Sequence, residues 1–254
     1  MKFRLAPSVV LYCALSLVLL SHCSHRTQAQ PIPNKTSNAN RLSSAEQDVL
    51  NEINQARLHP AEYASNLEGL KPFFKGKEYS PQGQAALSTT EGWDAVEDAI
   101  RFLRATQPQS PLTLSHGLCL AALAHVKDQS GTGATGHKGL DNGLIEQRVR
   151  AFGTWQGGIG ENLSYGSESA RERVLTWLID DGFASRGHRK RLLSGDYKVA
   201  GLSCGPHPKF GTMCVITLAG GFSDIDSAKQ PPSNQTKSIT PIQKPKRKKT
   251  ARRV

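Results

Sequence analysis

The sequence predicts an α+β domain, with helices first and a hairpin of two strands at the end. Apolar residues recur at helical spacing in several segments between residues 44 and 180. By contrast, the apolar runs at residues 199–204 and 214–219 are short and separated by turn residues, which is typical of strands. The 254 residues suffice for one ordinary domain with tails or for two small ones, and 37% of them are hydrophobic, which permits a globular core.

The N-terminus is typical of an export signal. Two basic residues precede an apolar run at residues 9–20, which is too short to span a bilayer comfortably. Ala29 offers a small residue for cleavage, so residues 1–29 are predicted to be a signal peptide. The alternative is a lipoprotein processing site that would leave lipid on Cys23. Both interpretations predict a secreted or extracytoplasmic protein whose mature chain has no transmembrane span.

A polar linker at residues 30–42 is expected to lead into one domain over residues 43–228. Residues 43–46 match a capping box, and apolar residues at helical spacing follow until Pro60 interrupts them. Further helices are expected at residues 61–66, 91–104, 114–129 and 170–180, the last ended by Gly182. Residues 68–90 are expected to be irregular, and the glycine-rich stretches at 133–143 and 158–166 to turn.

Export changes how the cysteines are interpreted, because disulfides persist outside the cytoplasm. Cys204 and Cys214 flank a turn-rich loop between the two predicted strands, and hairpin strands bring such positions together. We therefore expect a Cys204–Cys214 disulfide. Cys119 lies on an apolar helical face and is expected to be a buried free thiol. The sequence contains no CxxC motif, so a cysteine-based zinc site has no support.

The net charge of +11 is concentrated at the two ends of the chain. Of the 32 Lys and Arg residues, nine lie in residues 229–254 and three in residues 1–29, which leaves 20 in the middle against all 21 acidic residues. A near-neutral domain argues against a specific nucleic-acid binder. Residues 229–254 are expected to form a disordered basic tail, which offers salt-sensitive contacts to anionic envelope polymers.

Three polar stretches beside glycine are candidates for chemistry: residues 136–137, 160–162 and 186–189. They supply two imidazoles and a carboxylate, which are a reasonable ligand set for Zn²⁺ with a water in the open position. The same groups also suit acid/base chemistry, or a structural hydrogen-bond network. HExxH, GxSxG and phosphate-loop motifs are absent, so the common hydrolase and nucleotide-binding signatures do not apply.

These motifs, in this order, resemble the CAP superfamily, which includes cysteine-rich secretory proteins, antigen 5 and pathogenesis-related proteins of group 1. Its bacterial branch is known as SCP-domain proteins. The resemblance runs from about Leu50 to Phe222, and residues 68–110 look like a subgroup insertion. It is carried by the helix over residues 118–128, Gly136-His137, Gly160-Glu161-Asn162-Leu163, Trp177 and residues 187–193.

The resemblance implies an α-β-α sandwich with a surface cavity that two His and two acids line. The matching residues are His137, Glu161, His188 and Asp180. Some members bind a divalent metal there, so His137, His188 and Glu161 are candidate Zn²⁺ ligands. Asp180 is one CH₂ shorter than the Glu of eukaryotic members, which shortens its reach. In the metal-free alternative, Glu161 accepts hydrogen bonds from both imidazoles and locks the loops together.

Structural or solvent-exposed positions, without a role in a site, are expected for several neighbours of these residues. Asn162 is expected to cap a turn, and Trp177 to belong to the core. The run at residues 189–191 is expected to be a solvated charged surface. Structural or exposed positions are expected for His116, His125 and His207.

The function that the resemblance implies is a secreted or envelope-associated, non-enzymatic CAP/SCP binding module. Its extracellular ligand would be a lipid, a polymer or a protein, and neither the ligand nor the oligomeric state follows from the sequence. The alternative is a metal-assisted hydrolase of peptide or envelope polymer, with Glu161 or Asp180 as the base. A third interpretation is a stabilised scaffold whose basic tail carries the function.

Overall fold

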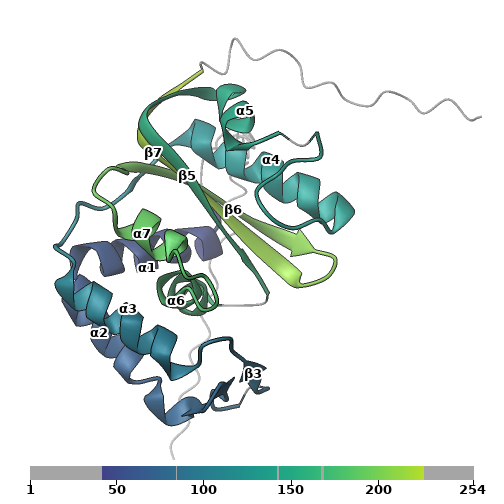
Figure 1. The fold of residues 1–254 in the computed structure, drawn as a ribbon. Helices are drawn as coiled ribbons and strands as arrows, with labels where there is room; N and C mark the ends of the chain where they lie inside the picture. Colours follow the sequence, from purple (N-terminus) through teal and green to yellow (C-terminus); the bar gives the residue numbers. More distant parts are fainter. Residues whose placement is uncertain (1–41, 84, 142, 167–168, 226–254) are drawn as a thin grey trace, which may run out of the picture. The chain divides into compact units, whose positions relative to one another are not determined.

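The computed structural model describes residues 42–225, except 84, 142, 167 and 168 (Figure 1). The predicted signal peptide, the linker up to residue 41, Cys23 and the predicted basic tail lie outside the described residues. Within residues 42–225, no helix is long and apolar enough to cross a membrane.

Two helices open the domain, α1 (Ser44–Leu58) and α2 (Pro60–Glu68). The predicted capping box is present: the Glu46 backbone N–H donates to the Ser43 hydroxyl, and the Ser43 N–H donates to the Glu46 carboxylate at 2.8 Å. Pro60 ends α1 as expected and also starts α2, where its missing N–H costs no helical hydrogen bond.

Residues 68–90 were expected to be irregular, but the structure shows regular elements in this segment. It contains a 3₁₀ turn, η2 (Lys71–Phe73), and a small antiparallel sheet in the order β1-β2-β3. The strands are β1 (Phe74–Lys75), β2 (Glu78–Tyr79) and β3 (Leu87–Ser88). Strands of two residues are too short for apolar alternation to show in a sequence. Helix α3 (Trp93–Ala105) follows, two residues later than predicted.

The main sheet has the order β4-β6-β7-β5. β4 (Thr113–Leu114) pairs in parallel with β6 (Val199–His207), and the other pairs are antiparallel. β7 (Gly211–Asp224) is central, and β5 (Gly153–Tyr165) forms an edge. The two predicted strands are confirmed as parts of β6 and β7. The expected turn at residues 158–166 is instead part of β5, whose glycines hid its strand character.

Helices cover both faces of this sheet: α4 (His116–Thr132) and α5 (Ile145–Arg150) one face, and α1, α6 (Ala170–Ile179) and α7 (Gly187–Leu193) the other (Figure 1). Alternate residues of β7 divide between the two sides. Met213 and Val215 pack in the α4 cluster, whereas Ile216 and Leu218 pack in the larger core with α1 and α6. The predicted α+β class and α-β-α layering are therefore confirmed. Helix α5 was not predicted.

The cysteines follow the sequence analysis in part. Cys204 and Cys214 lie directly opposite each other on β6 and β7, and they form the predicted disulfide. Cys119 is a free thiol as expected, but it is partly exposed rather than fully buried. Burial on α4 nevertheless raises its pKa to about 11, so the thiol is protonated and unreactive at neutral pH.

Replacing both Cys204 and Cys214 with serine should lower the free energy of unfolding by about 2–3 kcal/mol, because the disulfide restricts the unfolded chain. The fold should persist, since β6 and β7 also pair over nine residues. Urea unfolding monitored by circular dichroism measures the difference. Cys119→Ser is the matched control and should leave the midpoint nearly unchanged. Equal stability of the double variant and the parent would contradict the expectation.

Candidate functional site

Two consecutive residues of β5 organise the candidate site. Glu161 is 4% exposed and Asn162 is fully buried. Neighbouring residues of a strand point to opposite faces of the sheet. Accordingly, Glu161 contacts residues of α4, α5 and the loop between them, whereas Asn162 contacts α7. The candidate site is thus built on both sides of one edge strand.

The first pair joins His137 to Glu161. The His137 Nδ1 atom lies 2.9 Å from Glu161 Oε1, and the guanidinium of Arg148 on α5 donates to Glu161 Oε2 at 2.6 Å. Arg148 also donates to the backbone carbonyl of His137 at 3.1 Å. The imidazole is 47% exposed, whereas the side chain of Glu161 is 3% exposed. The sequence analysis did not identify Arg148, because it did not recognise the short helix that carries it.

The carboxylate of Glu161 is held in its ionised form. Burial by itself would raise its pKa, but the hydrogen bond from His137 and the positive charge of Arg148 outweigh that effect and hold the pKa below its usual range. Both carboxylate oxygens therefore act as hydrogen-bond acceptors for these two residues.

The residue before His137 is clamped by three side chains. Gly136 has φ +91°, a conformation that L side chains rarely adopt, which explains the glycine. Its N–H donates to the Tyr165 hydroxyl at 2.8 Å, and its carbonyl accepts from the Gln129 amide at 2.6 Å. The Tyr165 hydroxyl in turn donates to Gln129 Oε1 at 2.8 Å, which closes the ring of bonds. The third side chain, His125, lies 2.9 Å from the same carbonyl.

His125 is a structural histidine, one of the two roles expected for it. It is fully buried, and its Nε2 atom lies 2.9 Å from the Gly136 carbonyl and 4.0 Å from Glu161. Burial lowers its pKa and so favours the neutral ring, and the Gln129 amide nitrogen also lies 3.0 Å from Nε2. No described residue bonds its buried Nδ1 atom. His125 thus supports the loop that presents His137 and is not itself presented to solvent.

The second pair joins His188 to Asp180. Asp180 ends α6 in the left-handed conformation, two residues before the Gly182 that was expected to end it. Its Oδ1 atom lies 2.7 Å from His188 Nδ1, and its Oδ2 atom accepts the backbone N–H of His188 at 2.9 Å. The Asn162 amide donates to the His188 carbonyl at 3.1 Å. The His188 ring is 17% exposed and Asp180 is buried.

The four predicted cavity residues are therefore arranged as two histidine–carboxylate pairs. The expectation that Glu161 accepts from both imidazoles is wrong, because Arg148 takes its second oxygen and His188 bonds Asp180 instead. Within residues 42–225, no three His, Cys, Asp or Glu side chains are grouped so that they could hold a metal ion. The three-ligand set of His137, His188 and Glu161 does not fit this arrangement.

The donor chemistry still suits a metal held by the two imidazoles and solvent. Carboxylates that bond the Nδ1 atom orient metal-binding histidines in many proteins. Neither Nε2 atom of His137 or His188 has a hydrogen-bond partner among the described residues, so both remain available to a ligand. Zinc binding stays a prediction.

Two neighbouring expectations are corrected by the structure. Asn162 does not cap a turn, since it lies in β5 and ties that strand to α7. The run at residues 189–191 is solvated only in part: Lys190 is exposed, but Arg189 is 1% exposed and donates to Asp98 at 2.9 Å and to two backbone carbonyls at the end of α6. Trp177 lies in the core as predicted, and its indole N–H donates to the Leu163 carbonyl of β5.

Apolar side chains accompany both imidazoles. Phe183 is 56% exposed, and its ring lies edge-on to His188 with centroids 5.2 Å apart. Leu140 and Leu144 are also exposed, and they lie in the loop that follows His137. An exposed apolar side chain is not unusual by itself, but Phe183 contacts His188, and the two leucines follow His137 within seven residues of the chain.

Comparison with known proteins identifies the family. The sequence model of the cysteine-rich secretory protein (CAP) family matches residues 50–218. No curated protein matches the sequence. Among solved structures, an outer surface protein of Borrelia burgdorferi is 16% identical with a TM-score of 0.36, over 50% of this chain and 86% of that one.

Two further solved structures are similar. An extracellular protein with an SCP domain from Bacillus anthracis is 19% identical with a TM-score of 0.36, over 49% of this chain and 37% of that one. A cysteine-rich secretory protein from Staphylococcus aureus is 15% identical with a TM-score of 0.31, over 61% of this chain and 48% of that one.

Tyr165→Phe should loosen the His137 loop. The substitution removes one hydroxyl and leaves the Gly136 N–H and Gln129 Oε1 without their partner, which costs about 1–3 kcal/mol of unfolding free energy. Chemical denaturation measures the loss, and NMR of the His137 ring should show a shifted and broadened signal. Tyr197→Phe is the control, because no described residue bonds the Tyr197 hydroxyl. An unchanged His137 signal in Tyr165→Phe would refute the clamp.

Acid should destabilise the protein through Glu161. Because the folded state lowers the pKa of Glu161, its contribution to stability is present above the ordinary value of 4.5 and is lost as the pH falls through the lower folded value. The free energy of unfolding should therefore decrease below pH 4.5, and Glu161→Gln should weaken that dependence. Denaturant midpoints of the parent and of Glu161→Gln, measured from pH 7 down to about pH 3, give the two pH dependences. Parallel curves for the two proteins would contradict the assignment.

Proposed function

Because the chain belongs to the cysteine-rich secretory protein (CAP) family, we propose that it is a non-enzymatic binding module that works outside the cytoplasm. Its ligand site would be the surface that presents His137 and His188. The N-terminal signal pattern at residues 1–29 supports export. The basic residues at 229–254 would add a second, charge-based contact to anionic envelope polymers.

The observation that carries this proposal is the pairing of each imidazole with a buried carboxylate. Each pair fixes its ring through Nδ1 and leaves Nε2 without a partner among the described residues. A neutral imidazole nitrogen can accept a hydrogen bond or bind a metal, and a protonated one can donate. Two such rings, held in place before any ligand arrives, lower the entropy cost of binding.

The same pairs favour binding over hydrolysis. A carboxylate that acts as a general base must lie within hydrogen-bond reach of the water that it deprotonates. Both oxygens of Glu161 are engaged by His137 and Arg148. Both oxygens of Asp180 are engaged by the ring and the backbone N–H of His188. These contacts give each acid the role of orienting its histidine, and a binding site needs no more than that.

The surroundings support a ligand that is partly apolar. Phe183 contacts His188 edge-on and is more than half exposed, and two exposed leucines follow His137 in the chain. A ligand with one polar or metal-bound group for the imidazoles and an apolar portion for these side chains would use both features. Lipids and polypeptides both meet this description.

Zinc titration tests whether the two imidazoles act together. Calorimetry on the purified protein should give stoichiometric binding if both Nε2 atoms reach one ion, and the double variant His137→Ala/His188→Ala should lose it. Zn²⁺ serves here as the probe. His116→Ala/His59→Ala is a control that removes two imidazoles elsewhere. Binding that persists in the His137/His188 variant, or is lost in the control, would show that the site lies elsewhere.

An activity screen tests the non-enzymatic part of the proposal. Peptide and envelope-polymer substrates should show no turnover above background, with and without zinc. Turnover that disappears in folded His137→Ala and His188→Ala proteins would replace the binding module with the hydrolase. Turnover that both variants retain would exclude these residues as its source.

A further inference from the structure

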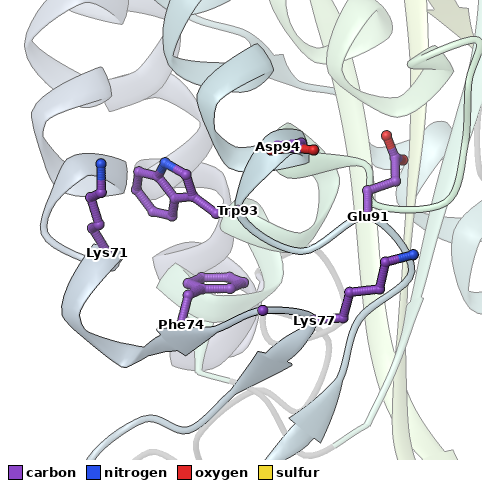
Figure 2. Close-up of a pocket in the computed structure, with 7 residues that line it drawn as sticks. Lys71, Phe74, Lys77, Glu91, Trp93 and Asp94 are labelled. Carbon is purple, nitrogen blue, oxygen red and sulfur yellow. The ribbon is translucent and has the colours of Figure 1, made fainter.

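A groove of about 420 Å³ lies apart from the two histidine pairs, on the segment that the sequence analysis singled out as an insertion. Its lining comes from residues 71–77 and 91–94, and none of the predicted cavity residues contributes (Figure 2). Its volume is within the range of about 300–1,000 Å³ that is usual for small-ligand sites. Neither the family match nor the proposed function accounts for this groove.

One part of the groove is aromatic and held in place. The rings of Phe74 and Trp93 meet edge to face, with centroids 5.6 Å apart (Figure 2). The Trp93 indole N–H donates to Glu97 at 2.6 Å, and Tyr79 packs on Phe74 from another side at 4.8 Å. These contacts fix the two lining rings in one arrangement, so an incoming ligand does not have to order them.

The shape of the groove depends on a close contact between two backbone segments. Gly92 has φ +73°, and a Cβ atom there would lie 2.6 Å from the carbonyl oxygen of Gly76. Only glycine at residue 92 lets the β1–β2 turn approach the start of α3 so closely. The shape of the groove therefore depends on glycine at residue 92.

The polar lining offers both donors and acceptors. The ammonium groups of Lys71 and Lys77 and the carboxylate of Asp94 are exposed. Lys71 also lies over the Trp93 ring, with Nζ 5.4 Å from the centroid. Glu91 is different, because the guanidinium of Arg186 binds both of its oxygens at 2.6 and 2.7 Å. The charge of Glu91 is thus already compensated.

This mixture of groups discriminates among ligand classes. A cationic ligand would be repelled by Lys71 and Lys77. An anionic ligand would be attracted by these two lysines and opposed only by Asp94, so an anionic probe belongs in the test. A purely apolar ligand would strip water from all three charges without replacing their hydrogen bonds. A neutral molecule with many hydroxyls and an apolar face avoids each of these costs.

We propose that this groove binds neutral carbohydrate, with an apolar sugar face on the Trp93 ring beside Phe74, where it would displace the exposed Lys71 side chain, and with hydroxyl groups bonded to Lys77 and Asp94. The C–H faces of a pyranose ring are apolar and pack against aromatic rings. A sugar hydroxyl can donate a hydrogen bond to the carboxylate of Asp94 and accept one from the ammonium group of a lysine. The groove is open and could hold an internal stretch of an oligosaccharide. This site does not depend on His137 or His188.

The test is an NMR titration of the full chain with neutral tetrasaccharides, using chitotetraose, cellotetraose and maltotetraose as probes. The indole N–H signal of Trp93 should shift on binding, whereas those of the core residue Trp177 and of Trp155 should not. The variant Lys77→Ala/Asp94→Asn should fold, because both side chains are exposed. The loss of these two groups should weaken sugar binding about tenfold. Lys127→Ala/Asp48→Asn makes the same charge change on exposed positions of other helices.

Three results would overturn the proposal. The first is a Trp93 signal that none of the three sugars shifts at about 10 mM, a concentration that detects even weak binding. The second is a shift that the Lys77/Asp94 variant retains in full or that the control variant loses. The third is stronger binding of an anionic probe such as inorganic phosphate than of any neutral sugar. The variant His137→Ala/His188→Ala should bind sugar normally, so failure of the proposed function remains distinguishable.

Discussion

The antiparallel pairing of β5 with β7 is the constraint on which the candidate site depends. It places Glu161 opposite Thr217 and Asn162 opposite Ile216, and so decides which of the two faces α5 and which faces α7. A slip of one residue would exchange their faces, because side chains alternate along a strand. Glu161 would then lose Arg148 and His137, and Asn162 would lose the carbonyl of His188. Both histidine loops are thus secured by one register.

Buried charged side chains tie the loops beside β5 to the neighbouring helices and strand. An ionised side chain that is removed from water is stable only when charges and hydrogen bonds replace its hydration. Glu161 obtains these partners from α5 and the His137 loop, and Asp180 obtains them from the first turn of α7. Arg189 is satisfied by Asp98 and by the last carbonyls of α6. Arg189 thus looks solvated in the sequence but holds α6, α7 and α3 together in the fold.

Much of the fold was predictable, and the reason lies in periodicity. Helices such as α1 and α3 and the hairpin of β6 and β7 carry clear apolar patterns, and the disulfide followed from that hairpin. β5 was not recognised, because its glycines remove the alternation that marks a strand. The resemblance placed His137 and His188 among the candidates, but their partners depend on distances between elements far apart in the chain. The role of Arg148 could not be predicted without α5, a helix of six residues whose pattern is too short to recognise.

The edges of the main sheet affect how readily the protein aggregates at high concentration. An exposed strand edge offers unpaired backbone groups to any other chain and so invites aggregation. On one side, β4 covers only the first two residues of β6, and the Glu46 carboxylate accepts the N–H of Cys204 farther along that strand at 2.8 Å. On the other side, the pairing of β5 shifts register between Gln156 and Ile159, which breaks the regular ladder. The irregularity that hid the strand character of β5 in the sequence also makes this edge a poor template for fibril growth.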